Sequence, residues 1–293
     1  MKKLIKLLFI FNLSLFSYAE EVDELKYGFL ESTLVSSFAD ARVAAKVWLE
    51  DIVSGNYEKK ANIEFYDSAD ILYKDLISGK LNMVVLDLEF FFKHKKNIEK
   101  IAHEFWSLNT FGTVYSQYYL IAKKSLNAKG FKNITGKSLA YKKGDISAEI
   151  WLDKNSLSIY KSEAKEKLKE IILVKKENAA LLNIFFNKTD FAIVTKKTWE
   201  IATELNPSIK KKIEIVAKSE KIHMPLIGLF RKDVKDSRIK SFFKVSENIS
   251  TVEGGREIVQ LLKFDSLFKV KDTDLNKMDK YYKEYFELKK KYK

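Results

Sequence analysis

The feature that most constrains the fold is an alternation of short apolar strands and amphipathic helices that occurs twice along the chain. In the first set, strands predicted at 25–30, 62–66 and 81–86 alternate with helices at 37–53, 69–78 and 89–100. The second set is shorter and comprises strands at 138–141, 171–174 and 191–194 with helices at 147–154 and 178–187. Strand–helix–strand repetition implies right-handed parallel crossovers in an open sheet, so the chain is predicted to be an α/β protein.

Each set is followed by two extended segments, which is where a chain crossing between two lobes would run. These segments are 103–108 with 113–123, and 213–217 with 222–230, and a helical part follows to the end of the chain. The order predicts lobe one at 22–112 plus 222–293 and lobe two at 113–221, each an open, mostly parallel sheet flanked by helices. One continuous doubly wound sheet remains the alternative.

The first nineteen residues have the layout of a secretory signal peptide. Lys2, Lys3 and Lys6 precede an apolar stretch over 7–16, and Ser17 and Ala19 are small residues suited to a cleavage site. The stretch is too short for a transmembrane helix, which needs about 20 apolar residues. The sequence therefore predicts a cleaved signal at 1–19 and a periplasmic protein; an uncleaved anchor or a core helix is the alternative.

Composition excludes several classes of site. The chain has no Cys and three His that lie far apart, so thiolate or zinc sites, disulfides and cysteine nucleophiles are not expected. No spacing of a nucleophile and a base stands out, and neither a catalytic site, nor a metal, nor a cofactor is predicted. The formal net charge is +13, but nucleic acid is not an expected partner of an exported chain. Solvated helix faces explain most of the Lys residues, and weak attraction to an anionic membrane surface is the alternative.

Three segments resemble one protein family. Residues 70–85 are similar to its helix, Gly turn and buried strand; 115–124 with 133–141 are similar to its crossing strand, turn and next strand; and 187–194 are similar to a strand entry in lobe two. The family is the type II periplasmic solute-binding proteins, in the branch linked to phosphate, phosphite and phosphonate uptake. The resemblance implies a two-lobe type II fold, a monomer, a small polar solute that is phosphonate- or phosphate-like, and an ABC permease as partner.

The chain departs from that family at two places that bear on the ligand. Asp87-Leu88 stands where the family often has Gly-Pro, and the segment 143–147 offers one hydroxyl and an added acid instead of a Ser/Thr-rich loop.

Candidate ligand-binding residues follow from a general rule, because ligands of open α/β sheets bind beyond the carboxyl ends of the strands. In lobe one these ends carry Glu31, Ser32, Thr33, Tyr66, Ser68 and Asp87. In lobe two they carry Lys143, Asp145, Ser147 and Thr195. The crossing segment adds Tyr115 and Ser116.

The charge of the ligand stays open. Hydroxyls at helix N-termini favour an anion, and four candidates fit that role: Ser32, Thr33, Ser68 and Ser147. Three carboxylates in the same region oppose it, namely Glu31, Asp87 and Asp145, since two like charges 4 Å apart repel by about 4 kcal/mol at an effective dielectric of 20. These acids either cap helices and point away or face the cleft, and in the second case a cationic or zwitterionic ligand is favoured. Tyr66 and Tyr115 would then stack on this ligand, or they only pack in the wall of the cleft.

The expected function is that of an exported, non-enzymatic receptor that closes two lobes around a small polar solute and delivers it to a membrane permease. A sensor that presents the solute to a membrane kinase or cyclase is the alternative output, and an exported enzyme on the same scaffold is a third hypothesis.

Overall fold

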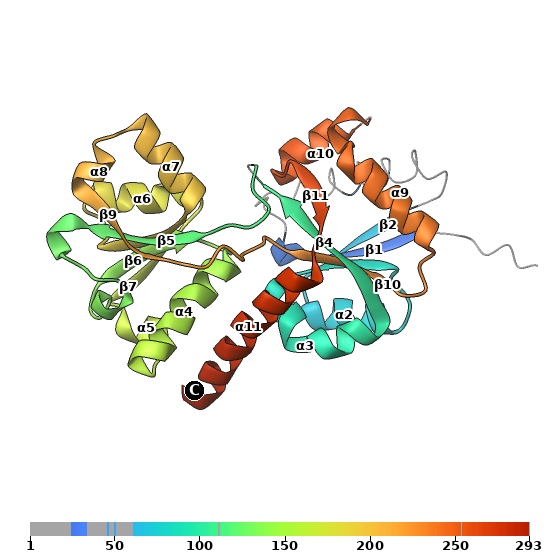
Figure 1. The fold of residues 1–293 in the computed structure, drawn as a ribbon, viewed down its shortest axis with the longest axis horizontal. Helices are drawn as coiled ribbons and strands as arrows, with labels where there is room; N and C mark the ends of the chain where they lie inside the picture. The colour runs from blue at the N-terminus through green and yellow to red at the C-terminus, as the bar shows by residue number, and fades with distance from the viewer. Residues whose placement is uncertain are drawn as a thin grey trace, which may run out of the picture.

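The computed structural model describes residues 25–33, 46, 50, 61–110, 112–252 and 254–292. The predicted signal peptide and most of the helix predicted at 37–53 lie outside these residues. Within them, the strands form two separate sheets (Figure 1), so the alternative of one continuous sheet is wrong. We call each sheet with its flanking helices a lobe.

The sheet of lobe one has the strand order β11-β4-β10-β3-β1-β2. Its strands are β1 (Leu25–Leu30), β2 (Ala61–Tyr66), β3 (Met83–Leu86), β4 (Ala102–Asn109), β10 (Ile227–Arg231) and β11 (Ser266–Lys269). β1 pairs in parallel with β2 and β3, as the strand–helix alternation predicts. β10 enters antiparallel between β3 and β4 because the chain returns from lobe two in the opposite direction.

The sheet of lobe two has the order β7-β6-β8-β5-β9. Its strands are β5 (Tyr118–Lys123), β6 (Ser138–Lys142), β7 (Glu170–Val174), β8 (Phe191–Thr195) and β9 (Ile213–Lys218). β6 is parallel to β7 and β8, whereas β5 and β9, the strands that lead in and out of the lobe, run antiparallel to their neighbours. The two segments of each predicted extended pair therefore belong to different sheets. The exact residues at which one lobe ends and the other begins, 22–112 plus 222–293 and 113–221, stay a prediction from the sequence.

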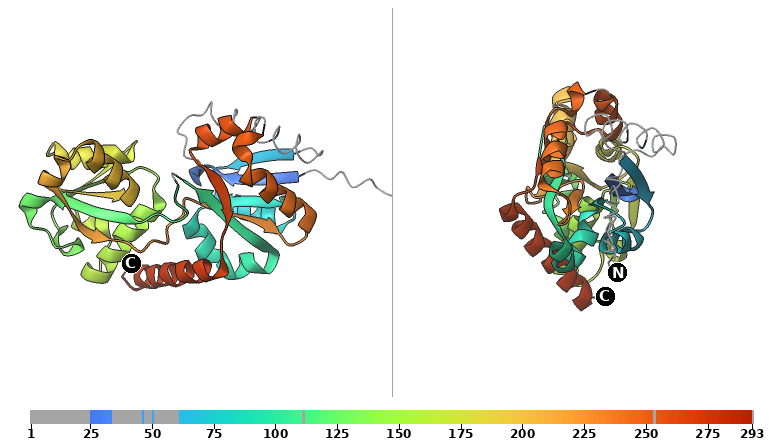
Figure 2. Two further views of the ribbon diagram at one scale, coloured as in Figure 1. Left: turned by 45° about the horizontal axis from the view of Figure 1, so that its top comes forward. Right: turned by 90° about the vertical axis from the view of Figure 1, so that its right-hand side faces the viewer.

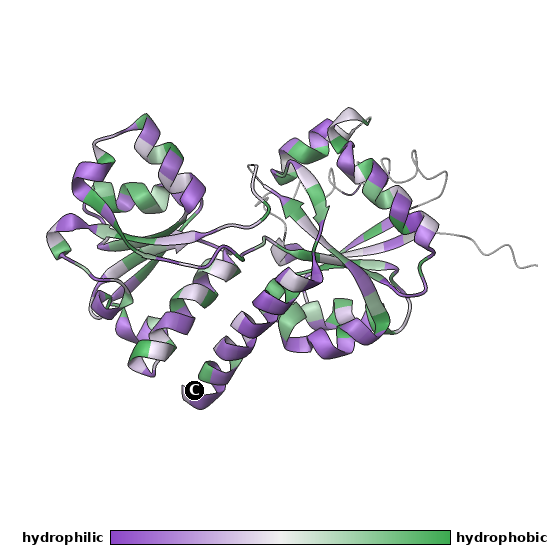
Figure 3. Cartoon of the chain, in the orientation of Figure 1, coloured by the Kyte–Doolittle hydropathy of each residue, from purple (hydrophilic) through white to green (hydrophobic). Residues whose placement is uncertain are grey.

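Helices cover both faces of each sheet (Figure 1). Those of lobe one are α2 (Ala69–Ile77), α3 (Leu88–Ile101), α9 (Asp236–Glu247), α10 (Gly255–Leu262) and α11 (Asp272–Tyr292). Those of lobe two are α4 (Ile146–Tyr160), α5 (Ala164–Lys167), α6 (Glu177–Phe185), α7 (Lys196–Leu205) and α8 (Ile209–Lys212). Figure 3 shows the apolar residues concentrated in the strands between these layers.

Strand β3 shows why the sheet needs cover on both sides. All four of its residues are buried. Val84 and Leu86 pack in one apolar cluster with α2, α3 and α11, and Met83 and Val85 pack in a second cluster with α9 and α10. Successive strand residues point to opposite faces, so a continuous apolar run such as this one is stable only with helices on both faces.

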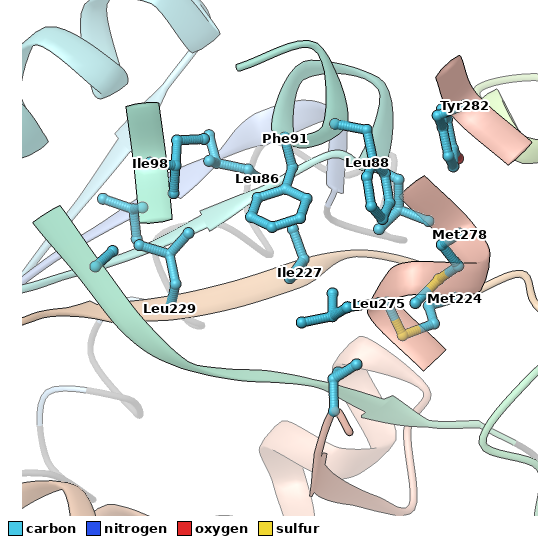
Figure 4. Packing of buried hydrophobic residues seen from close by; sticks show 14 of the residues in the cluster. Leu86, Leu88, Phe91, Ile98, Met224, Ile227, Leu229, Leu275, Met278 and Tyr282 are labelled. Atoms are coloured by element: carbon cyan, nitrogen blue, oxygen red, sulfur yellow. The ribbon is translucent and has the colours of Figure 1, made fainter. Parts of the chain in front are cut away.

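The C-terminal helix α11 contacts both lobes. It packs against α3 in lobe one and α4 in lobe two, and Figures 1 and 2 show it extending from the first lobe towards the second. Tyr282 stacks on Phe92 of α3, with ring centroids 4.6 Å apart. On the other side, Lys154 of α4 donates to Glu284 over 3.0 Å. Figure 4 shows α11 residues Leu275 and Met278 in the same apolar cluster as the helices and strands of lobe one.

Candidate functional site

The two segments that cross between the lobes lie side by side. Ser116 and His223 form an isolated antiparallel bridge, in which the Ser116 N–H donates to the His223 carbonyl over 2.7 Å. The Gln117 side-chain amide donates to the Ser219 carbonyl over 2.8 Å. These contacts pair the two crossing segments with each other, and α11 provides a second connection between the lobes.

In lobe two, Asp145 caps the helix that follows β6. Its carboxylate accepts hydrogen bonds from the Ala148 N–H over 3.0 Å and from the Tyr118 hydroxyl over 2.7 Å. Burial raises the pKa of Asp145, and these two hydrogen bonds oppose that shift. The carboxylate therefore serves as the N-cap of α4 and stays at the carboxyl edge of the sheet.

A second carboxylate of lobe two, Glu177, lies near Asp145. It is the first residue of α6 and accepts a hydrogen bond from the backbone N–H of Thr195. The Thr195 hydroxyl in turn caps α7 by accepting from the Thr198 N–H over 3.2 Å. Burial is the largest cause of the raised pKa of Glu177, and the charge of Asp145 adds to it. Glu177 was not among the predicted residues, although its position three residues after β7 is the signal that would have found it.

In lobe one, Asp87 caps α3. Its carboxylate accepts from the Phe90 N–H over 2.8 Å, and burial raises its pKa. Glu89, in the first turn of the same helix, also has a pKa raised mainly by burial. The negative charges of Asp87 and of Glu149 on α4 raise it further, while Lys289 and Lys93 oppose the shift. Acidic groups of the two lobes therefore influence one another across the crossing.

The remaining predicted residues of β1 and of the α4 N-terminus have varied exposure. Ser32 is exposed, Thr33 is buried and its hydroxyl donates to the Leu30 carbonyl over 2.6 Å, and Glu31 opens the short 3-10 helix η1 (Glu31–Thr33). Lys143 is exposed, and Ser147 is buried in the first turn of α4.

Three predicted residues use their hydroxyls elsewhere. The Tyr66 hydroxyl donates to Asp75 over 2.8 Å and contacts Glu64 at 2.9 Å. Asp75 lies near the end of α2, which runs back towards the amino ends of the strands, so this hydroxyl points away from the carboxyl edge. The Tyr115 hydroxyl donates to Asp274 at the start of α11 over 2.9 Å. Ser68 caps α2 by accepting from the Ile71 N–H.

Aromatic residues of α11 close one side of the region, which sequence reasoning missed. Tyr282 is 1% exposed, and its hydroxyl has no hydrogen-bond partner of good geometry within the described chain. Burial is the largest cause of the raised pKa of this hydroxyl, the charges of Asp87 and Glu89 raise it further, and an interaction with the Ser147 side chain opposes the shift. His223 lies against the rings of Tyr118 and Tyr281, and burial lowers its pKa to about 3, so its ring is neutral at pH 7.

A groove of about 580 Å³ runs beside the crossing segments, between α4 and α11. Aromatic rings and charges of both signs line it, including Trp151, Lys154, Lys218, Glu220, Tyr281 and Glu284. None of the twelve predicted ligand-binding residues lines this groove.

Two negative findings concern the described residues alone. They contain no group of three or more His, Asp or Glu side chains placed to hold a metal ion. None of their helices combines the length and apolarity needed to span a bilayer.

Searches with the sequence match no protein-family description and no curated protein. Comparison of the structure finds many solved chains with the same fold. The XAC2383 protein of Xanthomonas citri, bound to chloride, superposes with a TM-score of 0.64 at 10% identity, covering 91% of this chain and 99% of that one. PhnD1 of Prochlorococcus marinus, in complex with methylphosphonate, gives 0.56 at 10% identity over 89% and 98% of the two chains.

The periplasmic aliphatic sulphonate binding protein SsuA of Escherichia coli gives a TM-score of 0.51 at 9% identity, covering 92% of this chain and 94% of that one. Identities this low establish the fold and leave the ligand open. The resemblance seen in the sequence is confirmed at that level: this chain has the two-lobe α/β fold of the type II periplasmic solute-binding proteins, of the kind found in PhnD.

Proposed function

We propose that the protein is an exported receptor that closes its two lobes on a small polar solute and delivers it to an ABC permease. The observation that supports the proposal is that helices of both lobes begin with polar groups where they follow a strand, Asp87 and Glu89 in lobe one and Asp145, Ser147 and Glu177 in lobe two, while the two crossing segments pair with each other. Ligands of open α/β sheets bind at such carboxyl ends. Lobes commonly rotate about a few connecting residues, and the two crossing segments, which pair over a short stretch of backbone, are a connection of that kind.

The same proposal includes export and the absence of turnover. A signal peptide at 1–19 is the expected route across the inner membrane, and the similar solved structures include periplasmic and ABC-transporter binding proteins. Turnover of a bound solute on prolonged incubation would favour the enzyme hypothesis instead. A signalling output through a membrane kinase or cyclase differs only in the membrane partner.

A thermal-shift screen of residues 20–293 tests solute binding directly. The panel contains phosphate, alkylphosphonates, alkylsulphonates, amines, amino acids and vitamins. A ligand present at 100 times its dissociation constant stabilises the folded state by about 2.7 kcal/mol. For a chain of this size each kcal/mol raises Tm by about 2–4 °C, so a true ligand raises Tm by about 5–10 °C. A panel in which no compound of any class raises Tm contradicts the receptor proposal.

Reconstituting the permease distinguishes the two outputs. Solute uptake into vesicles that contain the cognate permease, dependent on this protein, supports delivery. Unchanged uptake, together with binding of the loaded protein to a membrane kinase or cyclase domain, supports sensing.

A further inference from the structure

The first observation is that two helix N-termini at the interlobe region are already occupied by carboxylates of the chain. Asp87 accepts from an N–H of the first turn of α3, and Asp145 does the same on α4. Free N–H groups at a helix N-terminus attract anions. Here those groups carry a negative side chain, so an anionic solute would have to approach a carboxylate at each helix.

The second observation is an excess of acid at the same place. Glu89 and Glu177 add two carboxylates to Asp87 and Asp145, and none of the four forms an ion pair within 4.0 Å in the part of the chain that the structure describes. Lysines act on them only from farther away, Lys142 on Asp145 and both Lys289 and Lys93 on Glu89. The nearby ring of His223 is neutral at pH 7.

These carboxylates are deep but still accessible to solvent. Asp87, Glu89, Asp145 and Glu177 all keep intermediate exposure, and burial is nevertheless the largest cause of the raised pKa of each. Each of these side chains is therefore partly enclosed by protein and still in contact with solvent.

A third observation concerns buried polar groups in the same region. The Tyr282 hydroxyl is buried and makes no hydrogen bond of good geometry within the described chain; Ser147 is close enough to interact with it, and the charges of Asp87 and Glu89 act on it. A buried hydroxyl without a partner costs the chain about 1–3 kcal/mol, and native proteins rarely leave such a group without water or a ligand. His223 Nε2, on the crossing segment, is likewise buried without a partner.

We propose that the solute is an organic cation, whose ammonium group is held by the carboxylates of Asp87 and Asp145 with Glu89 and Glu177 close by. The inference rests on the proposed receptor function and names the class of its solute. An ammonium group donates its N–H bonds, and the carboxylates and the Tyr282 hydroxyl oxygen accept them. The rings of Tyr118 and Tyr282 add aromatic surface beside the charge. Phosphonate, the ligand implied by the family resemblance, carries the opposite charge and would face repulsion from both lobes.

The test uses titration calorimetry on residues 20–293 with four matched probes and a wider panel. Ethanolamine and putrescine carry ammonium groups alone, methylphosphonate carries the anion alone, and 2-aminoethylphosphonate carries both. We expect an ammonium probe to bind and methylphosphonate not to bind. Binding of methylphosphonate, or of a neutral solute, in the absence of cation binding overturns the inference and leaves the receptor function standing. Binding of no solute of any class overturns both.

Charge-neutralising variants show whether the cation binds at this place. Asn is also a good N-cap residue, so Asp145→Asn keeps α4 capped while it removes the charge, and Glu177→Gln removes the second charge of lobe two. Each is expected to raise the Kd of the cation about tenfold or more. The control Glu200→Gln removes the same charge from an exposed site of α7 in the same lobe and should leave Kd within twofold. Equal effects of all three variants would mean that net charge alone attracts the cation.

Tyr282→Phe gives a readout that a merely structural role would not move. It removes the hydroxyl and keeps the ring stacked on Phe92, so the urea midpoint should stay at the wild-type value or rise. The Kd of the cation is expected to rise severalfold, and an unchanged Kd would show that the hydroxyl does not face the solute.

Discussion

Tyr66→Phe separates a structural role of this residue from the ligand-binding role predicted for it. The hydroxyl lies on a side chain that is 8% exposed and bonds to two carboxylates, Glu64 at 2.9 Å and Asp75 at 2.8 Å. A hydrogen bond to a charged group contributes about 1.5–3 kcal/mol when it is sheltered. Both acceptors are partly exposed and also contact Lys80, so solvent screening lowers that figure. We expect a loss of about 1–2 kcal/mol in the free energy of unfolding.

Urea unfolding followed by intrinsic fluorescence measures this loss as a lower midpoint at unchanged slope. The matched control is Tyr73→Phe, on the same helix as Asp75, because Tyr73 makes ring contacts with Phe90 and His94 and its hydroxyl forms no hydrogen bond with the described residues. The control should unfold within about 0.5 kcal/mol of wild type. The affinity for the solute should not change in either variant. If Tyr66→Phe has the urea midpoint of wild type, or binds the solute more weakly than wild type, the structural role of this hydroxyl beside Glu64 and Asp75 is refuted.

Three further outcomes are expected. Gly228→Ala should destabilise by about 3 kcal/mol or more in urea unfolding, because the added Cβ would lie 2.0 Å from Trp106 Cε2; wild-type stability would mean that the Trp106 ring moves freely. Thr189→Val should leave the urea midpoint unchanged or raise it, with a gain of up to about 1 kcal/mol, because the Thr189 hydroxyl is buried without a partner within the described residues; a clear loss would reveal a bound water or a hidden partner. His223 has a folded pKa of about 3, below its usual value of about 6.5, so its contribution to stability is complete above pH 6.5 and is lost as the pH falls towards 3. Between those values wild type should lose up to about 1.4 kcal/mol per pH unit more than His223→Phe, and parallel pH profiles of urea midpoints in the two proteins would contradict the buried neutral ring.

Much of the fold follows from local patterns. The apolar run of 81–86 predicted a strand covered on both faces, and its last four residues form β3 in the interior of its sheet. Ser68 begins α2 as the capping preference predicts, and its side chain accepts from the Ile71 N–H. The helical part predicted at the end of the chain includes α11, Asp272–Tyr292. Apolar runs and helix caps depend on residues that are close together in the chain, so they can be recognised in the sequence alone.

The site was less predictable. The rule of carboxyl ends nominated Asp87, Asp145 and Ser147 but could not tell that both acids cap their helices, since the direction of a carboxylate depends on the local turn. It also placed Tyr66 in the cleft, although its hydroxyl bonds to Asp75. Tyr282 was missed altogether, because it lies near the end of the chain and reaches the region only through the packing of α11 on α3 and α4.

By itself, the sequence determined the α/β class and the succession of strands and helices along the chain, because periodic burial and turn residues act over a few positions. Only the tertiary structure decided the order of the strands within each sheet, how the crossing strands enter each sheet, and that the C-terminal helix packs on both lobes. Those outcomes depend on contacts between segments more than a hundred residues apart, such as Lys154 with Glu284, and no local pattern encodes such distances.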